Sequence, residues 1–184
     1  MAQAAGAIVV RQEPNQGKGT ALQRGFRYAL EEGFDAVLTL DADGQHDPAE
    51  MPLFIDTFAA TFPETAPDLI IGRRRFGRCR GCAVWPTRQG ELFFSWAVGA
   101  YIRDNQSGYR LLSRRMMDAL LNSQEPGFEF EMEQIVVCLE RGYRLAWVPI
   151  RTIYAGETSH IQPLQHVRNF VKLSLNTRKR LRRK

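Results

Sequence analysis

The stretch AVLTLDADGQHDP, residues 36–48, joins a short apolar run to a cluster of acidic and amide side chains. Its first five residues are apolar enough to form a buried strand, and Asp41 and Asp43 follow directly. Asp47 and Pro48 then supply the N-cap and the first-turn proline of a helix. The stretch therefore predicts a strand, a polar loop and a helix in succession, which is a building unit of α/β sheets.

Short apolar runs and helix-like segments alternate on both sides of this stretch. Apolar or β-branched runs predict strands at residues 8–10, 36–40, 69–71 and 145–150. Apolar residues at helical spacing predict helices at 20–32, after Asp47, at 91–101, at 129–141 and from residue 163 onward. This alternation predicts an α/β fold with a largely parallel sheet and helices on both faces.

The length and composition fit one globular domain. The chain has 184 residues, of which 44% are hydrophobic and 24% charged, a balance that excludes a disordered or collagen-like protein. No apolar run reaches the roughly 18 residues of a membrane span, and the first ten residues lack the basic start of a signal peptide. We therefore expect a cytoplasmic protein with one main domain at residues 1–163, followed by an amphipathic, basic helix or tail at residues 164–184.

Basic side chains are concentrated in two places. The formal net charge is +5, but the last seven residues hold six basic side chains, and five arginines lie between residues 73 and 80. The remainder is acidic, so we interpret the two clusters as local sites for an anion, whether phosphate, lipid headgroup or nucleic acid. The acidic body and the lack of a recognition motif argue against nucleic acid. The tail from Arg178 to Lys184 is either an anchor to an anionic membrane surface or a frayed, solvated end.

The three cysteines do not form a recognisable site. They are too few for a disulfide framework, and the CRGC motif lacks the second ligand pair that a structural zinc site needs. We therefore expect Cys79, Cys82 and Cys138 to be free thiols.

The loop at residues 41–48 has the side chains of a site for a hard cation. Asp41 and Asp43 are one residue apart, Gln45 offers a neutral oxygen, and His46 lies nearby. The loop follows the predicted strand 36–40, and ligands of open α/β sheets bind outside the carboxyl ends of strands. Two carboxylates leave a divalent ion partly uncompensated, so a diphosphate is a fitting further ligand. The alternative is a solvated acidic turn. An EF-hand is excluded because the glycine falls at the wrong position of the loop.

A glycine-rich segment, NQGKGT at residues 15–20, opens the first predicted helix. Lys18 and the unpaired backbone N–H groups of a helix start favour an anion. The segment is not a Walker A loop, because glycine follows the lysine where that motif has serine or threonine. The alternative is a glycine-rich turn between strand and helix.

Five motifs in a fixed order carry a family resemblance. They are NQGKGTALQRGF from Asn15, TLDADGQHDP from Thr39, IIGRRR from Ile70, DNQSGYRLLSR from Asp104 and GETSHIQPLQH from Gly156. Over residues 6–170 the chain resembles the family 2 glycosyltransferases, especially the dolichol-phosphate mannosyltransferase-like branch. The resemblance implies the GT-A fold, a donor site that uses Mg²⁺ or Mn²⁺, and inverting transfer from a nucleotide-diphospho-sugar. The implied acceptor is a polyprenyl phosphate or another lipid-linked molecule, handled at the inner face of the cell membrane during envelope synthesis.

The resemblance also implies roles for individual residues. Asp41, Asp43 and Gln45 match the metal and diphosphate motif, and Asp43 and Asp104 are the implied catalytic residues. The residues expected to contact the donor or its phosphates are Lys18, Arg73, Arg74, Arg88, Arg110, Ser159 and His160. Glu157 belongs to the same late loop as the last two. A phosphate acceptor is already ionised and needs cations to hold it, whereas a hydroxyl acceptor would need Asp104 as a base. From spacing alone, Asp104 would instead pair with Arg103 or Arg110.

One departure from the family pattern concerns the first strands. Family members begin with two strands that build the pocket for the nucleotide base, whereas residues 1–10 here match the third strand. A sheet without those strands exposes an apolar edge, so we expect marginal stability, a replacement partner such as a second copy, or a fragment of a longer protein. The alternatives to an active transferase are therefore a catalytically incompetent remnant that binds a partner and a membrane-surface module that works through the tail.

Overall fold

The computed structural model describes residues 1–74, 84–127, 129–151, 153 and 163–182. The elements in chain order are η1 (Gln3–Ala5), α1 (Lys18–Glu31), β1 (Ala36–Thr39), η2 (Pro48–Glu50), α2 (Met51–Ala59), β2 (Leu69–Arg74), α3 (Val84–Val98), β3 (Arg110–Ser113), α4 (Arg114–Leu120), α5 (Phe130–Glu140), β4 (Leu145–Ile150) and α6 (Pro163–Leu181). The helices expected near 20–32, 129–141 and from 163 onward are confirmed, as is the strand at 145–150. The helix expected at 91–101 begins earlier, at Val84, and ends at Val98.

The four described strands form one sheet in the order β1-β3-β2-β4. Strands β1, β2 and β4 run in the same direction, since β2 and β4 pair in parallel and β3 is antiparallel to both β1 and β2. The expected α/β fold is therefore confirmed with a mixed sheet, in which β3 is the exception to the parallel direction. The sequence does not indicate β3, because RLLS is short and begins with arginine, and it does not indicate the following helix α4.

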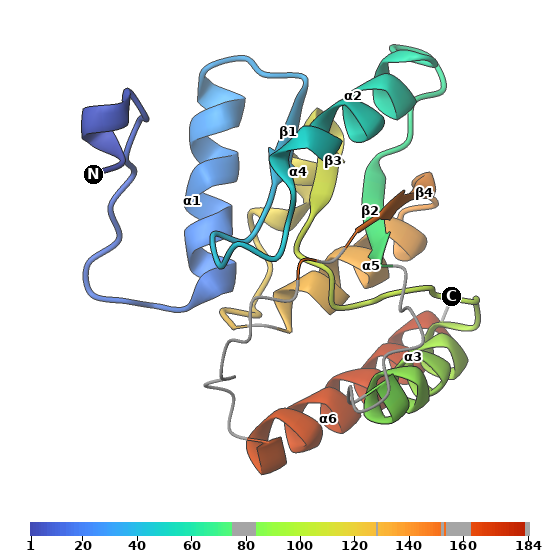
Figure 1. Cartoon of the computed structure of the whole chain (residues 1–184). Helices are drawn as coiled ribbons and strands as arrows, with labels where there is room; N and C mark the ends of the chain where they lie inside the picture. Colours follow the sequence, from blue (N-terminus) through green and yellow to red (C-terminus); the bar gives the residue numbers. More distant parts are fainter. Residues whose placement is uncertain (75–83, 128, 152, 154–162, 183–184) are drawn as a thin grey trace.

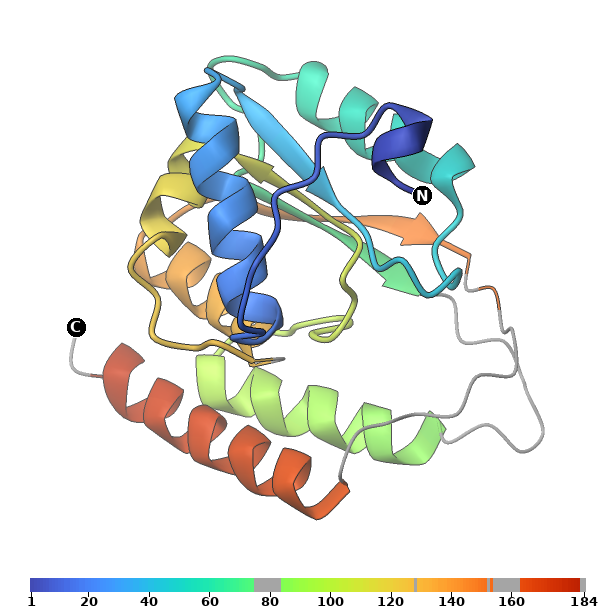
Figure 2. The same ribbon diagram turned by 90° about the vertical axis from the view of Figure 1, so that its left-hand side faces the viewer.

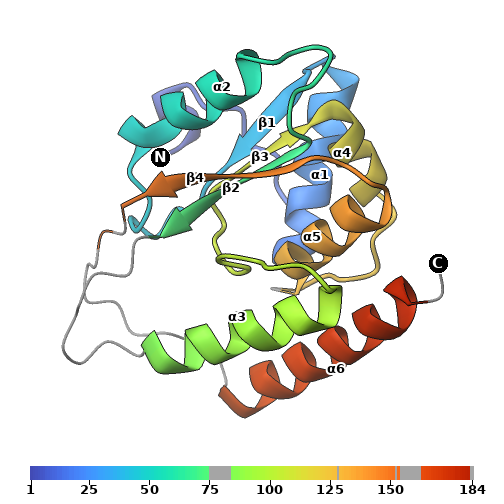
Figure 3. The ribbon, with the colours of Figure 1, turned by 90° about the vertical axis from the view of Figure 1, so that its right-hand side faces the viewer.

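Helices cover both faces of this sheet (Figure 1). Strand β2 shows the alternation expected for a strand buried on both sides: Leu69 and Ile71 join the larger core with α1, α4 and α5, whereas Ile70 joins the smaller core under α2. Phe54 of α2 and Tyr109 stack with ring centroids 4.5 Å apart in that smaller core. Helices α3 and α6 lie side by side as a further, outer layer (Figure 3).

The strand expected at residues 8–10 is wrong. The segment contains no strand, and Ile8, Val9 and Val10 are all exposed; it runs past α1 as an extended connection (Figure 2). A β-branched run becomes a strand only where another strand accepts its backbone hydrogen bonds. No described strand pairs with this segment, and the outer edge of β1 is left without a described partner.

Candidate active site

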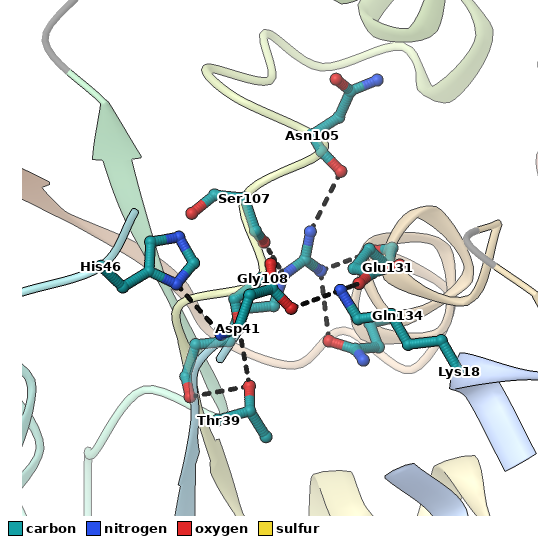
Figure 4. A network of polar contacts seen from close by, with 10 residues as sticks. Lys18, Thr39, Asp41, His46, Asn105, Ser107, Gly108, Glu131 and Gln134 are labelled. Carbon is teal, nitrogen blue, oxygen red and sulfur yellow. Dashed lines mark hydrogen bonds and ion pairs between the residues drawn. The ribbon is translucent and has the colours of Figure 1, made fainter. Parts of the chain in front are cut away.

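The carboxyl end of β1 leads into the predicted metal-site loop, which lies next to Lys18. The loop after β1 brings Asp41 to the N-terminus of α1, which supplies Lys18, and to the start of α5, which supplies Glu131 (Figure 4). The segment before β3 runs directly behind this group. The site therefore combines segments that are far apart in sequence.

Lys18 bridges two carboxylates. Its Nζ lies 2.6 Å from Asp41 Oδ1 and 2.6 Å from Glu131 Oε1. Burial disfavours the charge of Lys18, but Glu131 and Asp41 outweigh burial and raise the pKa of the ammonium. The sequence does not indicate Glu131 as a site residue, because nothing in its helical context marks it as the partner of a lysine in another helix.

The glycines beside Lys18 serve close packing. Gly17 has a left-handed φ of 95°, and a side chain at Gly17 or Gly19 would collide with the carbonyl of Pro126 or Glu125. The Gly19 amide donates to the Pro126 carbonyl oxygen at 2.7 Å. This helix start is thus partly covered by residues 125–127, which favours the interpretation of NQGKGT as a tight turn over that of an anion cradle.

Gly108 provides the surface on which the Asp41 carboxyl group rests. A methyl group added at Gly108 would overlap all three atoms of that carboxyl group. Thr39 holds the same segment, since its hydroxyl donates to the Gly108 carbonyl oxygen at 3.0 Å. The glycine of the DNQSGYR motif is therefore required by the position of Asp41.

His46 supports the loop from inside. Its Nδ1 accepts the Asp41 backbone N–H at 3.1 Å, and its ring lies 5.0 Å from the Tyr109 ring. Burial lowers the pKa of His46, and outweighs the opposite effects of Asp41 and Asp43. The imidazole is therefore neutral at pH 7 and carries its proton on Nε2.

Asp43 and Gln45 form a turn in the loop, in which Asp43 is exposed and Gln45 is half-buried. Asp43 Oδ1 accepts the Gln45 backbone N–H at 3.0 Å, which closes an Asx turn, and Asp43 is exposed to solvent. Asp47 caps the following helix by accepting the Ala49 N–H at 2.9 Å, as expected.

Asp41, Asp43 and Gln45 offer carboxylate and amide oxygens, which are the kind of ligand that a hard cation binds. Asp43 makes no ion pair with a described residue, whereas Asp41 is shared with Lys18. No group of three His, Cys, Asp or Glu gathers at any one point of the described residues. A cation in this loop would therefore be held by the two carboxylates, the amide oxygen of Gln45 and the oxygens of a bound diphosphate.

Asp104 is the partner of Arg74. The Arg74 guanidinium donates to both carboxylate oxygens at 2.8 Å, and its backbone N–H donates to Oδ2 at 3.1 Å. Asp104 is 2% exposed and has a left-handed φ of 89°. The pairing with Arg103 or Arg110 suggested by spacing is wrong, because the turn at Asp104 directs its carboxylate to the end of β2. A carboxylate held this way orients the cation that it pairs with.

Arg110 is wholly buried behind the site. Its guanidinium donates to the carbonyl oxygens of Asn105, Ser107 and Glu131 and to Gln134 Oε1. Burial lowers its pKa to about 10, against the attraction of Glu131 and Asp104. This placement favours a role for Arg110 in shaping the segment before β3 over the predicted contact with phosphate.

Other predicted site residues lie in less fully described parts of the chain. Arg73 is half-buried in β2 and alternates with Arg74, so the two side chains leave the strand on opposite faces. The side chain of Arg88 and the residues Glu157, Ser159 and His160 lie outside the described residues, as do Cys79 and Cys82. Cys138 is a free, buried thiol whose pKa is raised to about 12 by burial.

Comparison with known proteins assigns the family. Residues 1–120 match the model of Glycosyl transferase family 2, so the chain belongs to this family. It is 29% identical to an undecaprenyl-phosphate mannosyltransferase of Micrococcus luteus, over 77% of this chain and 59% of that protein. It is 28% identical to a UDP-N-acetylglucosamine–dolichyl-phosphate N-acetylglucosaminyltransferase of Methanococcus voltae, over 80% and 59%.

Solved structures show the same fold. A glucosyl-3-phosphoglycerate synthase from Mycobacterium tuberculosis, in complex with Mn²⁺, UDP-glucose and phosphoglyceric acid, has a TM-score of 0.63 at 19% identity and covers 96% of this chain. The GT-A-like α/β fold is thereby confirmed. The chain spans 58% of that structure and 59% of the two relatives.

Proposed function

We propose that this chain carries the donor site of a glycosyltransferase that moves a sugar from a nucleotide-diphospho-sugar to a polyprenyl phosphate. The observation that carries the proposal is the Asp41 carboxylate, fixed between Lys18 and Gly108 next to the turn of Asp43 and Gln45. The relatives named after polyprenyl-phosphate acceptors support the acceptor class.

The charges of the site explain why a divalent cation belongs to the proposal. Lys18 and Arg110 balance Asp41 and Glu131, and Arg74 balances Asp104. Asp43 then remains as an exposed carboxylate that repels a diphosphate. Mg²⁺ or Mn²⁺ held by Asp41, Asp43 and Gln45 would reverse that charge and supply electrostatic stabilisation of the leaving diphosphate.

The transfer is a single displacement with inversion. An oxygen of the acceptor phosphate forms a bond to the anomeric carbon as the bond from that carbon to the diphosphate oxygen breaks, and nucleoside diphosphate leaves. The acceptor phosphate is ionised at neutral pH, so no proton has to be removed. Asp104 therefore acts by holding Arg74 toward the phosphates, and Lys18 by holding Asp41.

A second candidate is a catalytically incompetent remnant that acts as a binding module. The observations that favour it are the exposed side chains of residues 8–10 and the outer edge of β1, which no described strand covers. A second copy of the chain is the proposed partner at that edge. This candidate predicts nucleotide-independent association of copies and no sugar transfer.

The test is transfer of labelled sugar from UDP- and GDP-sugars to a short-chain polyprenyl phosphate, with and without Mn²⁺. We expect metal-dependent transfer by the full chain, abolished in Asp43→Ala and retained in Asp56→Ala, which removes an exposed carboxylate from α2. Equal activity of Asp43→Ala and the full chain would contradict the site, and absence of transfer from a folded sample would favour the remnant.

A further inference from the structure

A pocket of about 830 Å³ lies at the end of the sheet opposite to the proposed donor site. Helix α1 runs from Lys18 at the donor site to Glu31, which lines the pocket, so its 14 residues separate the two places by about 20 Å. The connection from α2 to β2 forms one wall of the pocket, and the start of α4 forms another. None of the described residues assigned to the donor site lines it.

Part of the pocket lining is apolar and aromatic. Phe58 and Phe62 line it with their ring centroids 5.1 Å apart, and Leu30 and Leu121 line it from the ends of α1 and α4. Phe62 is 46% exposed, so the fold does not cover its ring. Aromatic side chains bind apolar groups, and their ring faces also attract cations. The pocket can therefore hold the apolar body of a ligand.

The charged side chains around this apolar part leave a negative balance. Five carboxylates and three guanidinium groups line the pocket, which gives a net charge of −2. Two of the guanidinium groups are already used within the fold. Arg114 donates to the carbonyl oxygens of Leu30 and Phe34, and Arg115 pairs with Asp68. The excess charge that a ligand meets is therefore negative.

Four of the five carboxylates are exposed and form no hydrogen bond or ion pair with a described residue. They are those of Glu31, Asp35, Glu64 and Asp118. One exposed carboxylate attracts a cation only weakly, but here two helix ends add to the four. Helices α1 and α2 both end at the pocket, where a helix carries partial negative charge, and neither has a basic residue in its last turn. These groups together outweigh Arg27, the remaining guanidinium of the lining.

We propose that this pocket binds an organic cation with an apolar body, such as an aromatic or alkyl amine. The apolar body lies against Phe58 and Phe62, and the ammonium group lies among the carboxylates and the two helix ends. The volume of the pocket falls within the roughly 300–1,000 Å³ of small-molecule sites. The inference goes beyond the proposed function, because it assigns a second ligand to the opposite end of the sheet.

The test is calorimetric titration of the full chain at low salt with tryptamine, tryptophol and indole-3-propionic acid. These probes share an indole ring and differ in charge, being a cation, a neutral alcohol and an anion. We expect tryptamine to bind about tenfold more tightly than tryptophol, and the anion to bind most weakly. The double variant Glu64→Gln/Asp118→Asn should lose most of the preference for the amine and keep its affinity for the alcohol. The matched control is Asp56→Asn, which changes an exposed carboxylate of α2 outside the pocket.

Three results would overturn the proposal: no binding of tryptamine to the unchanged chain, equal affinity for the amine and the alcohol, or equal tryptamine affinity in the unchanged chain and the double variant. Circular dichroism melting verifies that the variants fold. Asp43→Ala separates this pocket from the donor site, because Asp43 does not line the pocket and its loss should leave tryptamine binding unchanged. Loss of tryptamine binding in that variant would place the amine at the donor site and contradict the proposal.

Discussion

At the scale of single residues, the site depends on how Asp41 is held. Its carboxylate rests on Gly108, is paired with Lys18, and receives its direction from the His46 contact to its backbone. The sequence identified Asp41 and Lys18 from their motifs. It could not identify Glu131 or the pairing of Asp104 with Arg74, because those partners are chosen by the tertiary arrangement.

Replacing Gly108 with alanine should displace the Asp41 carboxylate, because the new methyl group would occupy its place. We expect metal-dependent nucleotide binding to weaken by about tenfold, the equivalent of one lost charged contact of roughly 1.4 kcal/mol. Titration calorimetry measures this. Gly25→Ala is the control, since nothing lies within 4 Å of a methyl group there, and its nucleotide binding should be unchanged.

Asp104 and Arg74 should behave as one unit in stability measurements. Removing either partner deprives the other of the charged hydrogen bonds of this pair, which costs about 1–3 kcal/mol. We therefore expect Asp104→Asn, Arg74→Ala and the double variant to lose similar free energies of unfolding in urea titrations. Additive losses in the double variant would show that the two residues do not depend on each other.

At the scale of elements, Asp68 joins the amino ends of β2 and β4 to the carboxyl end of β3. It precedes β2, accepts from the Ser113 hydroxyl at the end of β3 and from the Arg144 N–H before β4, and pairs with Arg115 of α4. Although burial opposes the charge, the bonds from Arg115, Arg144 and Ser113 outweigh it and lower the pKa of Asp68. The sheet therefore depends on side-chain contacts of Asp68 that cannot be predicted from the spacing of apolar residues.

Asp68 should make stability pH-dependent. Its pKa is lower in the folded chain than its usual 3.8, so the stabilisation is complete above that value and is lost as pH falls through the folded pKa. We expect Asp68→Asn to be less stable than the unchanged chain by about 1–3 kcal/mol at neutral pH, with a difference that shrinks in acid. Urea unfolding across a pH series measures it; a constant difference would contradict the ion pair.

Long periodic segments were predictable, whereas short strands were not. The apolar spacing of residues 20–32, 129–141 and 163 onward indicated α1, α5 and α6, and the run at 145–150 matched β4. The run at residues 8–10 has the composition of a strand but lacks a neighbour, whereas β3 is a strand of only four residues that begins with arginine. In both cases, whether the segment forms a strand depends on pairing with another strand that is distant in sequence.

At the scale of the whole molecule, the proposed donor site lies at the carboxyl end of β1, and α3 and α6 form an outer helical layer (Figures 1 and 3). No helix of the described residues is long and apolar enough to cross a bilayer. Asp104 lies in the connection from α3 to β3. We propose that this chain, which spans 59% of each of the two relatives, holds the cation-binding and phosphate-binding part of the site.

The most direct test of this account is calorimetric titration of the full chain with UDP, GDP and dTDP, each with and without Mn²⁺. The uncompensated charge of Asp43 predicts binding of one nucleotide in the presence of the metal and a large loss of that binding in its absence. Binding that is equally strong without the metal, or no binding of any nucleotide to a folded chain, would contradict the assignment of Asp41, Asp43 and Gln45.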